Sequence, residues 1–165
     1  MTPFEDRAAR AVAQWRRERP DLDPFPMEVL GRLTELAQVI LRDRLNPAFA
    51  GFGLQQGEFD VLATLRRSGA PYALTPTALC DAAMISSGGM TARIDRLEKA
   101  GLIARQKHPT DRRGTLVALT DSGKTLIDAM LPAHVETERG ILAALTDDEQ
   151  RTLNALLAKL LAGLG

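Results

Sequence analysis

The middle of the chain holds the pattern that narrows the choice of fold more than any other: two short helical segments followed by two β-compatible runs. Thr75-Pro76 is typical of a helix start, with a threonine N-cap and a proline at the first helical position, so we expect a short helix over residues 76–83. A turn near residues 84–85 would separate it from a second helix that stops at Gly101. The second helix turns one apolar face to a core, formed by Met90, Ile94 and Leu97. Two short helices joined by a short turn predict a helix-turn-helix.

The two β-compatible runs predict a hairpin. They cover residues 102–108 and 115–119, and the segment between them contains Pro109 and Gly114, which favour a tight tip. A hairpin that follows a helix-turn-helix is the wing of a winged helix. We therefore expect a mainly α fold with a small β-hairpin wing.

Longer helical patterns lie on both sides of this region. We expect them over residues 5–19, from a linker with Pro24 and Pro26 to near Asn46-Pro47, from Gln55 to a cap at Ser68-Gly69, from Thr120-Asp121 to about Arg139, and after a capping box of Thr146 and Glu149. The leucine-rich face of residues 153–164 indicates a partner helix. Residues 1–165 would then form one domain, with N-terminal helices over 5–50, the winged helix-turn-helix over 54–120 and C-terminal helices over 121–165.

Composition excludes several classes of protein. With 165 residues, 45% of them apolar, the chain can bury one core without disulfides or a metal. No stretch approaches the roughly 18–20 consecutive apolar residues of a membrane span, and the single cysteine, Cys80, cannot form an intrachain disulfide. The first nineteen residues lack the apolar run of a signal peptide, so we expect a cytoplasmic protein.

The sequence does not indicate an enzyme. It lacks a Gly-rich phosphate loop, metal-ligand spacing and a catalytic triad pattern, and the two histidines are far apart in sequence. We expect His108 to be a polar residue of the wing and His134 to lie on a helix surface. No metal and no resident cofactor are expected.

Basic residues concentrate in the centre of the chain, although its formal net charge is zero. Between residues 86 and 113 seven basic residues face three acidic ones, a local charge of plus four, whereas from residue 120 onward four face seven. Each Lys or Arg placed on a phosphate releases a condensed counterion, so a basic helix-turn-helix suits double-stranded DNA. The alternative is a set of ordinary solvated side chains.

The second short helix is nearly bare on its outward side, where Gly88, Gly89 and Ala92 would allow it to enter a major groove. The alternative is that Ser86 or Ser87 is only an N-cap and that the two glycines form a loose first turn. The residues that we expect to contact DNA are Ser86, Ser87, Gly88, Thr91 and Arg96 of this segment and Lys107, Arg112 and Arg113 of the wing.

At these positions the chain resembles the MarR family of winged-helix regulators over roughly residues 25–160. The resemblance implies a homodimer that interleaves its terminal helices and places two recognition helices on a pseudo-palindromic operator. It is carried by Gly57-Glu58-Phe59-Asp60-Val61-Leu62, Ser86-Ser87-Gly88-Gly89-Met90-Thr91, Arg96-Leu97-Glu98-Lys99-Ala100-Gly101-Leu102, Asp111-Arg112-Arg113 and Leu119-Thr120-x-x-Gly123.

A narrower resemblance is to the PecS-like, urate-responsive branch of that family. It is carried by Gln14-Trp15-Arg16, Arg19-Pro20-Asp21-Leu22-Asp23 and Arg67-x-Gly69-Ala70-Pro71-Tyr72. The resemblance implies a ligand site formed by Trp15, Asp60 and Arg93, with Arg105 as a further anion contact. A planar purine anion can stack on an indole ring and accept hydrogen bonds from a guanidinium group.

We therefore expect a ligand-responsive transcriptional regulator, a repressor, whose DNA binding is attenuated by a small aromatic anion such as urate. Two other switches stay open: oxidation of Cys80 and a different phenolic or aromatic ligand. A winged-helix protein-interaction module is the alternative from another class of function, and it would lack steeply salt-dependent DNA binding.

Overall fold

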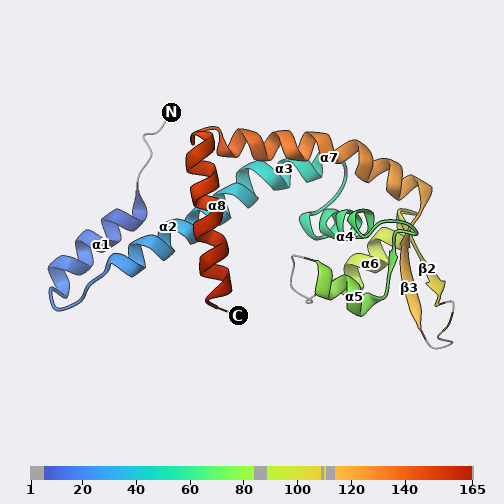
Figure 1. Ribbon diagram of the computed structural model, residues 1–165, viewed down its shortest axis with the longest axis horizontal. Helices are drawn as coiled ribbons and strands as arrows, with labels where there is room; N and C mark the ends of the chain where they lie inside the picture. The colour runs from blue at the N-terminus through green and yellow to red at the C-terminus, as the bar shows by residue number, and fades with distance from the viewer. Residues whose placement is uncertain (1–5, 84–88, 109, 111–113, 165) are drawn as a thin grey trace. The chain divides into compact units, whose positions relative to one another are not determined.

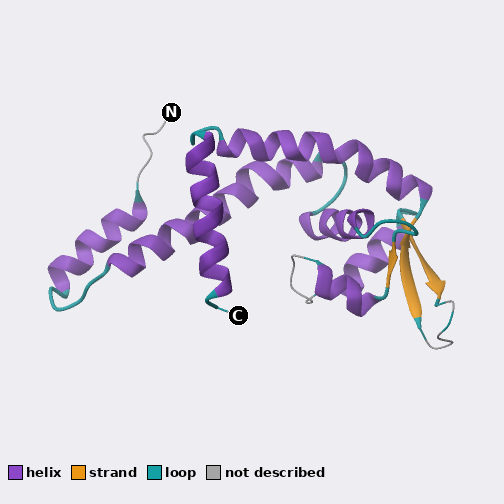
Figure 2. Cartoon of the chain, viewed as in Figure 1, coloured by secondary structure: helices purple, strands orange, loops and turns teal. Residues whose placement is uncertain are grey.

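The computed structural model describes residues 6–83, 89–108, 110 and 114–164, and the chain divides into two compact units, residues 1–44 and 45–165. Figure 1 labels the elements in chain order, and Figure 2 shows that helices predominate and that the strands form one small group. Among the described residues, no helix is both long enough and apolar enough to cross a membrane.

The first unit contains a helical hairpin of α1 (Arg7–Glu18) and α2 (Phe25–Ile40) (Figure 1). Ala8 and Val12 of α1 are buried. Asp6 caps α1 by accepting a hydrogen bond from the backbone of Ala9 at 2.9 Å, and its carboxylate also pairs with Arg32 of α2 at 2.6 Å. The predicted N-terminal amphipathic helix therefore packs on its small apolar face.

The second predicted helix starts and ends elsewhere than its prolines suggest. Pro24 is the N-cap of α2 and Pro26 lies in its first turn, where a missing N–H leaves no hydrogen bond unmade. The expected stop near Asn46-Pro47 is wrong. The chain passes through a π-helical turn, η1 (Leu41–Leu45), and α3 (Asn46–Ala50) follows at once with Pro47 in its own first turn.

The second unit holds the predicted helix-turn-helix and wing. Its central helices are α4 (Gln56–Arg67), α5 (Pro76–Ala82) and α6 (Met90–Lys99). Thr75 caps α5 as predicted, because its side chain accepts a hydrogen bond from the backbone of Ala78 at 3.1 Å. Gly101 follows α6 with a φ of 71°, which explains the glycine at that stop.

The wing strands β2 (Ile103–Lys107) and β3 (Thr115–Leu119) pair antiparallel, with Arg105 opposite Val117. A two-residue strand that the sequence pattern did not predict, β1 (Ala73–Leu74), pairs with the other edge of β3, so the sheet order is β1-β3-β2. β1 anchors the segment before α5 to the base of the wing.

The core of this unit lies between the helices and the sheet. Helices α4 to α6, helix α7 (Asp121–Leu142) and the wing strands β2 and β3 each contribute at least one fully buried side chain. These side chains are Leu62 and Leu65 of α4, Leu79 of α5, Leu97 of α6, Ile103 of β2, Val117 of β3 and Ile127 of α7. The helix-turn-helix and the wing therefore form one packed body.

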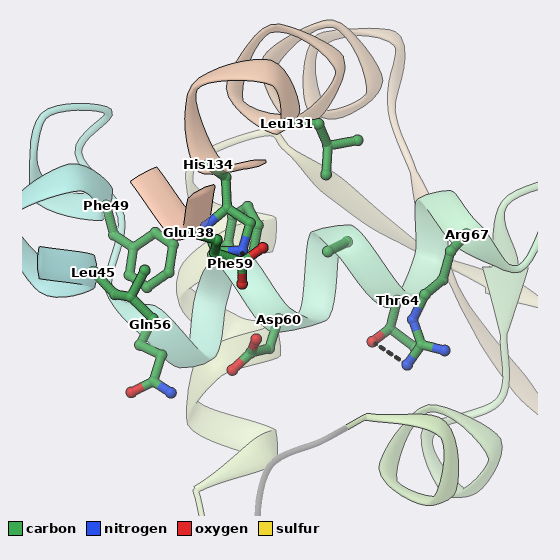
Figure 3. Close-up of a pocket in the computed structure, with 11 residues that line it drawn as sticks. Leu45, Phe49, Gln56, Phe59, Asp60, Thr64, Arg67, Leu131, His134 and Glu138 are labelled. Carbon is green, nitrogen blue, oxygen red and sulfur yellow. Dashed lines mark hydrogen bonds and ion pairs between the residues drawn. The ribbon is translucent and has the colours of Figure 1, made fainter. Parts of the chain in front are cut away.

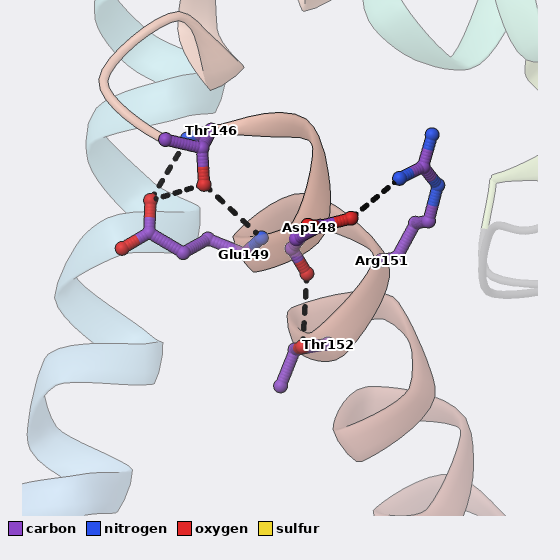
Figure 4. Close-up of polar contacts among 5 residues, drawn as sticks. All are labelled: Thr146, Asp148, Glu149, Arg151 and Thr152. Carbon is purple, nitrogen blue, oxygen red and sulfur yellow. Dashed lines mark hydrogen bonds and ion pairs between the residues drawn. The ribbon is translucent and has the colours of Figure 1, made fainter.

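The chain ends in α8 (Asp147–Ala162), which leaves the end of α7 after a short turn (Figure 1). Its predicted capping box is present: the Glu149 carboxylate accepts from the Thr146 backbone at 2.8 Å, and the Thr146 hydroxyl accepts from the Glu149 backbone (Figure 4). No described residue of α8 is buried: Leu153 and Leu157 are partly exposed, whereas Leu161 is 72% and Leu156 55% exposed. The leucine-rich face is therefore unburied within a single chain.

Candidate functional site

Helix α6 turns one face to the core and the other to solvent. Met90, Ile94 and Leu97 are buried, as their spacing predicts. Thr91 and Arg96, both expected to contact DNA, are exposed and flank the buried stripe on its two sides. The helix therefore leaves polar side chains accessible beside its buried face.

The prediction that Gly89 lies inside the first turn of this helix is wrong. Gly89 is the N-cap of α6 and adopts a left-handed backbone with a φ of 79°, so α6 begins only at Met90. A β-carbon makes that conformation unfavourable, which is a physical reason for glycine here. Because glycine has no side chain, the start of α6 lacks a side-chain cap.

Of the other residues expected to contact DNA, Lys107 is exposed at the end of β2. Ser86, Ser87, Gly88, Arg112 and Arg113 lie outside the described residues.

Two ion-pair groups fix α6 to its surroundings. On one side, the Arg96 Nε donates to Glu58 Oε1 of α4 at 2.6 Å. On the other, the guanidinium of Arg105 on β2 pairs with both Asp95 and Glu98 of α6. Helix α6 is thus joined through side chains to α4, hereafter the scaffold helix, and to the wing.

A cavity of about 390 Å³ lies between α4 and α7 (Figure 3). Its walls combine apolar and aromatic side chains with a few polar groups, the usual composition of a small-molecule site. Phe49 and Phe59 stack with ring centroids 4.7 Å apart, and the His134 ring lies 4.5 Å from that of Phe59. The lining residues are Leu45, Phe49, Gln56, Phe59, Asp60, Ala63, Thr64, Arg67, Leu131, His134 and Glu138.

Two polar atoms at this cavity are buried and lack a hydrogen-bond partner among the described residues: Asp60 Oδ2 and His134 Nδ1. Burial raises the pKa of the Asp60 carboxyl above its usual value, against the opposing attraction of His134, Arg93 and Arg67. His134 is held from its other side, because Nε2 lies 3.2 Å from Glu138 Oε1. An unmatched buried acceptor is unfavourable, so a ligand that donates to it would gain binding energy there.

Arg93 lies beside this cavity and lines an adjoining one with Gln56 and Gly57. Its guanidinium passes so close to Gly57 that a β-carbon at that position would come within 2.3 Å of Nε. Glycine at position 57 therefore gives Arg93 its place against α4. The positive charge of Arg93 attracts the carboxylate of Asp60, which is located one turn after Gly57 on α4.

Comparison with known proteins identifies the family of this chain. The model of the MarR family matches residues 52–114, from the turn before α4 to the wing. The HTH-type transcriptional regulator PecS of Dickeya dadantii is 47% identical over 127 residues, which span 77% of this chain and 76% of PecS. The chain belongs to the MarR family. It is a transcriptional regulator and not an enzyme, as predicted.

Solved MarR-type structures match the fold. Sco3205 of Streptomyces coelicolor, a MarR family regulator solved in complex with DNA, is 27% identical with a TM-score of 0.76, over 87% of this chain and 89% of that one. BpsR of Bordetella bronchiseptica, whose DNA binding is regulated by 6-hydroxynicotinic acid, is 26% identical with a TM-score of 0.72, over 80% of this chain and 91% of that one. The predicted winged-helix fold is confirmed.

The structure places the four residues of the PecS-like ligand prediction in different surroundings. Asp60 and Arg93 lie close enough to interact electrostatically. Trp15 belongs to α1 in the first unit, with 43% of its surface exposed. Arg105 lies on β2, paired with acidic residues of α6. The predicted set therefore stays a prediction as a whole.

Sequence reasoning missed a polar residue that α7 contributes to the cavity. His134 was expected on a helix surface, but its side chain is only 15% exposed and its ring packs, tilted, against two phenylalanines. The expectation is wrong because α7 packs against α4 at this point. A signal was available on α4, where Phe59, Ala63 and Arg67 recur at helical spacing and all line the cavity.

Proposed function

We propose that this MarR family member is a homodimeric, ligand-responsive repressor. It binds a pseudo-palindromic operator through α6 and the wing, and a small planar aromatic anion such as urate releases it. The carrying observation is that α4 lines a cavity with Asp60, whose Oδ2 atom is buried and unmatched, and also holds α6 by an ion pair between Glu58 and Arg96. Because its partner is chromosomal DNA, we place the protein in the cytoplasm.

The DNA-binding part of the proposal rests on the exposed polar face of α6. Thr91 suits a base edge or a thymine methyl, and Arg96 suits a guanine or a phosphate. Relatives support it: PecS is an HTH-type regulator, and Sco3205 was solved with DNA.

The homodimer rests on the unburied apolar face of α8. Leu156, Leu160 and Leu161 of α8, and Leu164 just after it, are each more than half exposed, which is unfavourable for apolar side chains that stay in water. A second copy would bury them and present two recognition helices with a two-fold relation. Half-sites about one helical turn apart, roughly 34–36 Å, would then follow.

The effector class follows from the cavity between α4 and α7. Its aromatic walls suit a flat ring, and Asp60 and His134 offer unmatched polar atoms to ring N–H and carbonyl groups. Arg93 beside them provides positive charge for an anion. Urate has such groups, and so does 6-hydroxynicotinic acid, which regulates BpsR. We propose no metal and no resident cofactor.

The ligand releases the protein from DNA by competing for Arg93. An anion beside Asp60 would attract the Arg93 guanidinium and draw it from its place over Gly57, so α6 would lose its position for the groove. By linkage, the ligand must bind the DNA-incompetent state more tightly. A coupling free energy of about 1–3 kcal/mol would weaken operator binding roughly 5- to 150-fold.

A paired titration tests the proposal. Urate is added to the protein while emission of its single tryptophan, Trp15, is recorded, and operator binding is measured under the same conditions. We expect saturable loss of operator binding, and quenching if Trp15 contacts the ligand. Arg93→Ala should bind DNA yet ignore urate, whereas Arg112→Ala should bind DNA weakly with a flatter salt dependence. Operator binding unaffected by saturating urate and by 6-hydroxynicotinic acid would remove the effector assignment.

Repression is tested separately by in vitro transcription from a promoter that overlaps the bound site. We expect transcripts to fall when the protein is added and to return with urate. A rise on addition of protein alone would show an activator.

A further inference from the structure

Glu58 is a buried carboxylate that holds two groups from different places in the chain. Only 7% of the residue is exposed. Its Oε2 accepts a hydrogen bond from the backbone N–H of Gln55 at 2.8 Å, which caps the start of α4. Its Oε1 accepts from Arg96 Nε at 2.6 Å, across the space between α4 and α6.

This pair leaves most of the Arg96 guanidinium available. A guanidinium has five N–H donors, and the Nε–H is the one that Glu58 accepts. The four N–H bonds of the two terminal nitrogens suit an acceptor pair, either O6 and N7 of a guanine or two oxygens of a phosphate. The Arg96 side chain is 48% exposed, whereas that of Glu58 is 9% exposed, so the pair is buried at the carboxylate end and open at the other.

Because Glu58 already restricts the Arg96 side chain, Arg96 loses less conformational entropy when it binds DNA. An unrestrained arginine side chain on a helix samples many rotamers, and immobilising such a side chain on binding costs conformational entropy. Glu58 is itself immobilised by burial and by its bond to the Gln55 backbone, so it can hold Arg96 in one position.

We propose that Glu58 is a positioning residue for DNA recognition, which holds the Arg96 guanidinium so that its terminal nitrogens meet an acceptor pair on the duplex. The inference rests on the proposed DNA-binding function. It assigns a role to a residue of the scaffold helix that does not itself reach the DNA.

The substitution Glu58→Gln separates this role from helix capping. The glutamine oxygen can still accept the Gln55 N–H, but its amide nitrogen then faces Arg96 Nε, and the ion pair is lost. Asp128→Asn is the matched control. Asp128 pairs with Arg66 Nε at the same 2.6 Å and joins α7 to α4 without touching α6.

Affinity is measured on a duplex selected by the wild-type protein from a randomised library, and on a random-sequence duplex. We expect Glu58→Gln and Arg96→Ala each to lower affinity for the selected duplex by roughly 5- to 20-fold, within the range of one bidentate contact. The double variant should bind no worse than Arg96→Ala alone, and Asp128→Asn should match wild type within about 2-fold. Loss on the selected duplex only indicates a guanine contact, and equal loss on both indicates a phosphate contact.

A general structural effect would give a different result. If Glu58→Gln bound like wild type, or if its loss were fully retained in the Arg96→Ala background, the positioning role would be overturned. Thermal unfolding of each variant, followed by circular dichroism, identifies any loss that comes from unfolding. A wild-type protein that selects no duplex at all would overturn the proposed function and this inference with it, whereas the double-variant comparison overturns the inference alone.

Discussion

Among the glycines compared in the described residues, Gly123 is the one where an added methyl group meets the nearest main-chain atom. It lies in the first turn of α7 and is buried against the backbone that links α6 to the wing. A β-carbon there would come within 1.9 Å of the Leu102 carbonyl oxygen. The obstacle is main chain rather than the end of a flexible side chain, so the two segments have to separate.

The size of the effect follows from what that separation breaks. The Leu102 carbonyl would have to recede by about 1.5 Å to reach 3.4 Å, where ordinary contact begins. Two hydrogen bonds hold the same junction: Thr120 N–H to Leu102 O at 3.1 Å and Thr120 Oγ1 to Gly101 O at 2.7 Å. Losing these two bonds costs about 1 kcal/mol each, and overpacking adds about 1–3 kcal/mol. Alanine's helix propensity regains about 1 kcal/mol. The expected destabilisation is therefore roughly 2–4 kcal/mol.

Gly140 in the same helix provides the control. A β-carbon there meets no described atom within 4 Å, so Gly140→Ala should gain about 1 kcal/mol from helix propensity alone. By thermal unfolding at one protein concentration, we expect Gly123→Ala to lower Tm by about 5–15 °C and Gly140→Ala to raise it by about 2–4 °C. Shifts of the same sign, or a Gly123→Ala variant as stable as wild type, would refute the reasoning.

Three further predictions test other features. The raised pKa of Asp60 means that the folded protein loses stability as pH rises from about 3.8 through that raised value. Asp60→Asn should therefore raise Tm at about pH 7, and the gain should shrink towards pH 4; a gain independent of pH would contradict the burial argument. Thr146→Ala should destabilise the start of α8 by roughly 1 kcal/mol, measured by thermal unfolding, whereas Thr152→Ala, which loses only a bond to a carbonyl within the helix, should be nearly neutral. Leu156→Glu combined with Leu160→Glu should convert the protein to monomers in analytical ultracentrifugation, while Arg151→Glu on the exposed side should not; a dimer that survives both leucine changes would place the interface elsewhere.

Local signals in the sequence were sufficient for most helix boundaries. Thr75, Thr120 and Thr146 were each predicted as helix starts, and each side chain accepts the expected backbone hydrogen bond. These predictions succeed because a cap depends on three or four neighbouring residues and on little else. The buried face of α6 was predictable for the same reason, since helical periodicity alone decides which side is apolar.

The failures have other causes. The two-residue strand β1 forms only by pairing with β3, which is remote in sequence, and no single residue type is diagnostic of the π-helical turn before α3. Asp60 and His134 lie 74 positions apart, and only the packing of α7 on α4 brings them to one cavity. Asp60 could be named from its resemblance to a family motif, but nothing in the sequence around His134 indicates that it turns inward.

The first two turns of α4 explain how a ligand could act on DNA binding without disturbing the core. Gly57 lies under Arg93, Glu58 holds Arg96, and Asp60 faces the cavity, so one short stretch of helix touches the proposed effector site and both arginines of α6. Transmission through the buried leucines would require repacking a dense core, at about 1–3 kcal/mol, which is as much as the whole coupling free energy typical of such switches. A shift of Arg93 and Arg96 against one rigid turn leaves those buried contacts in place. For the switch proposed above, the polar junction between α4 and α6 is therefore the energetically favoured route from the cavity to α6.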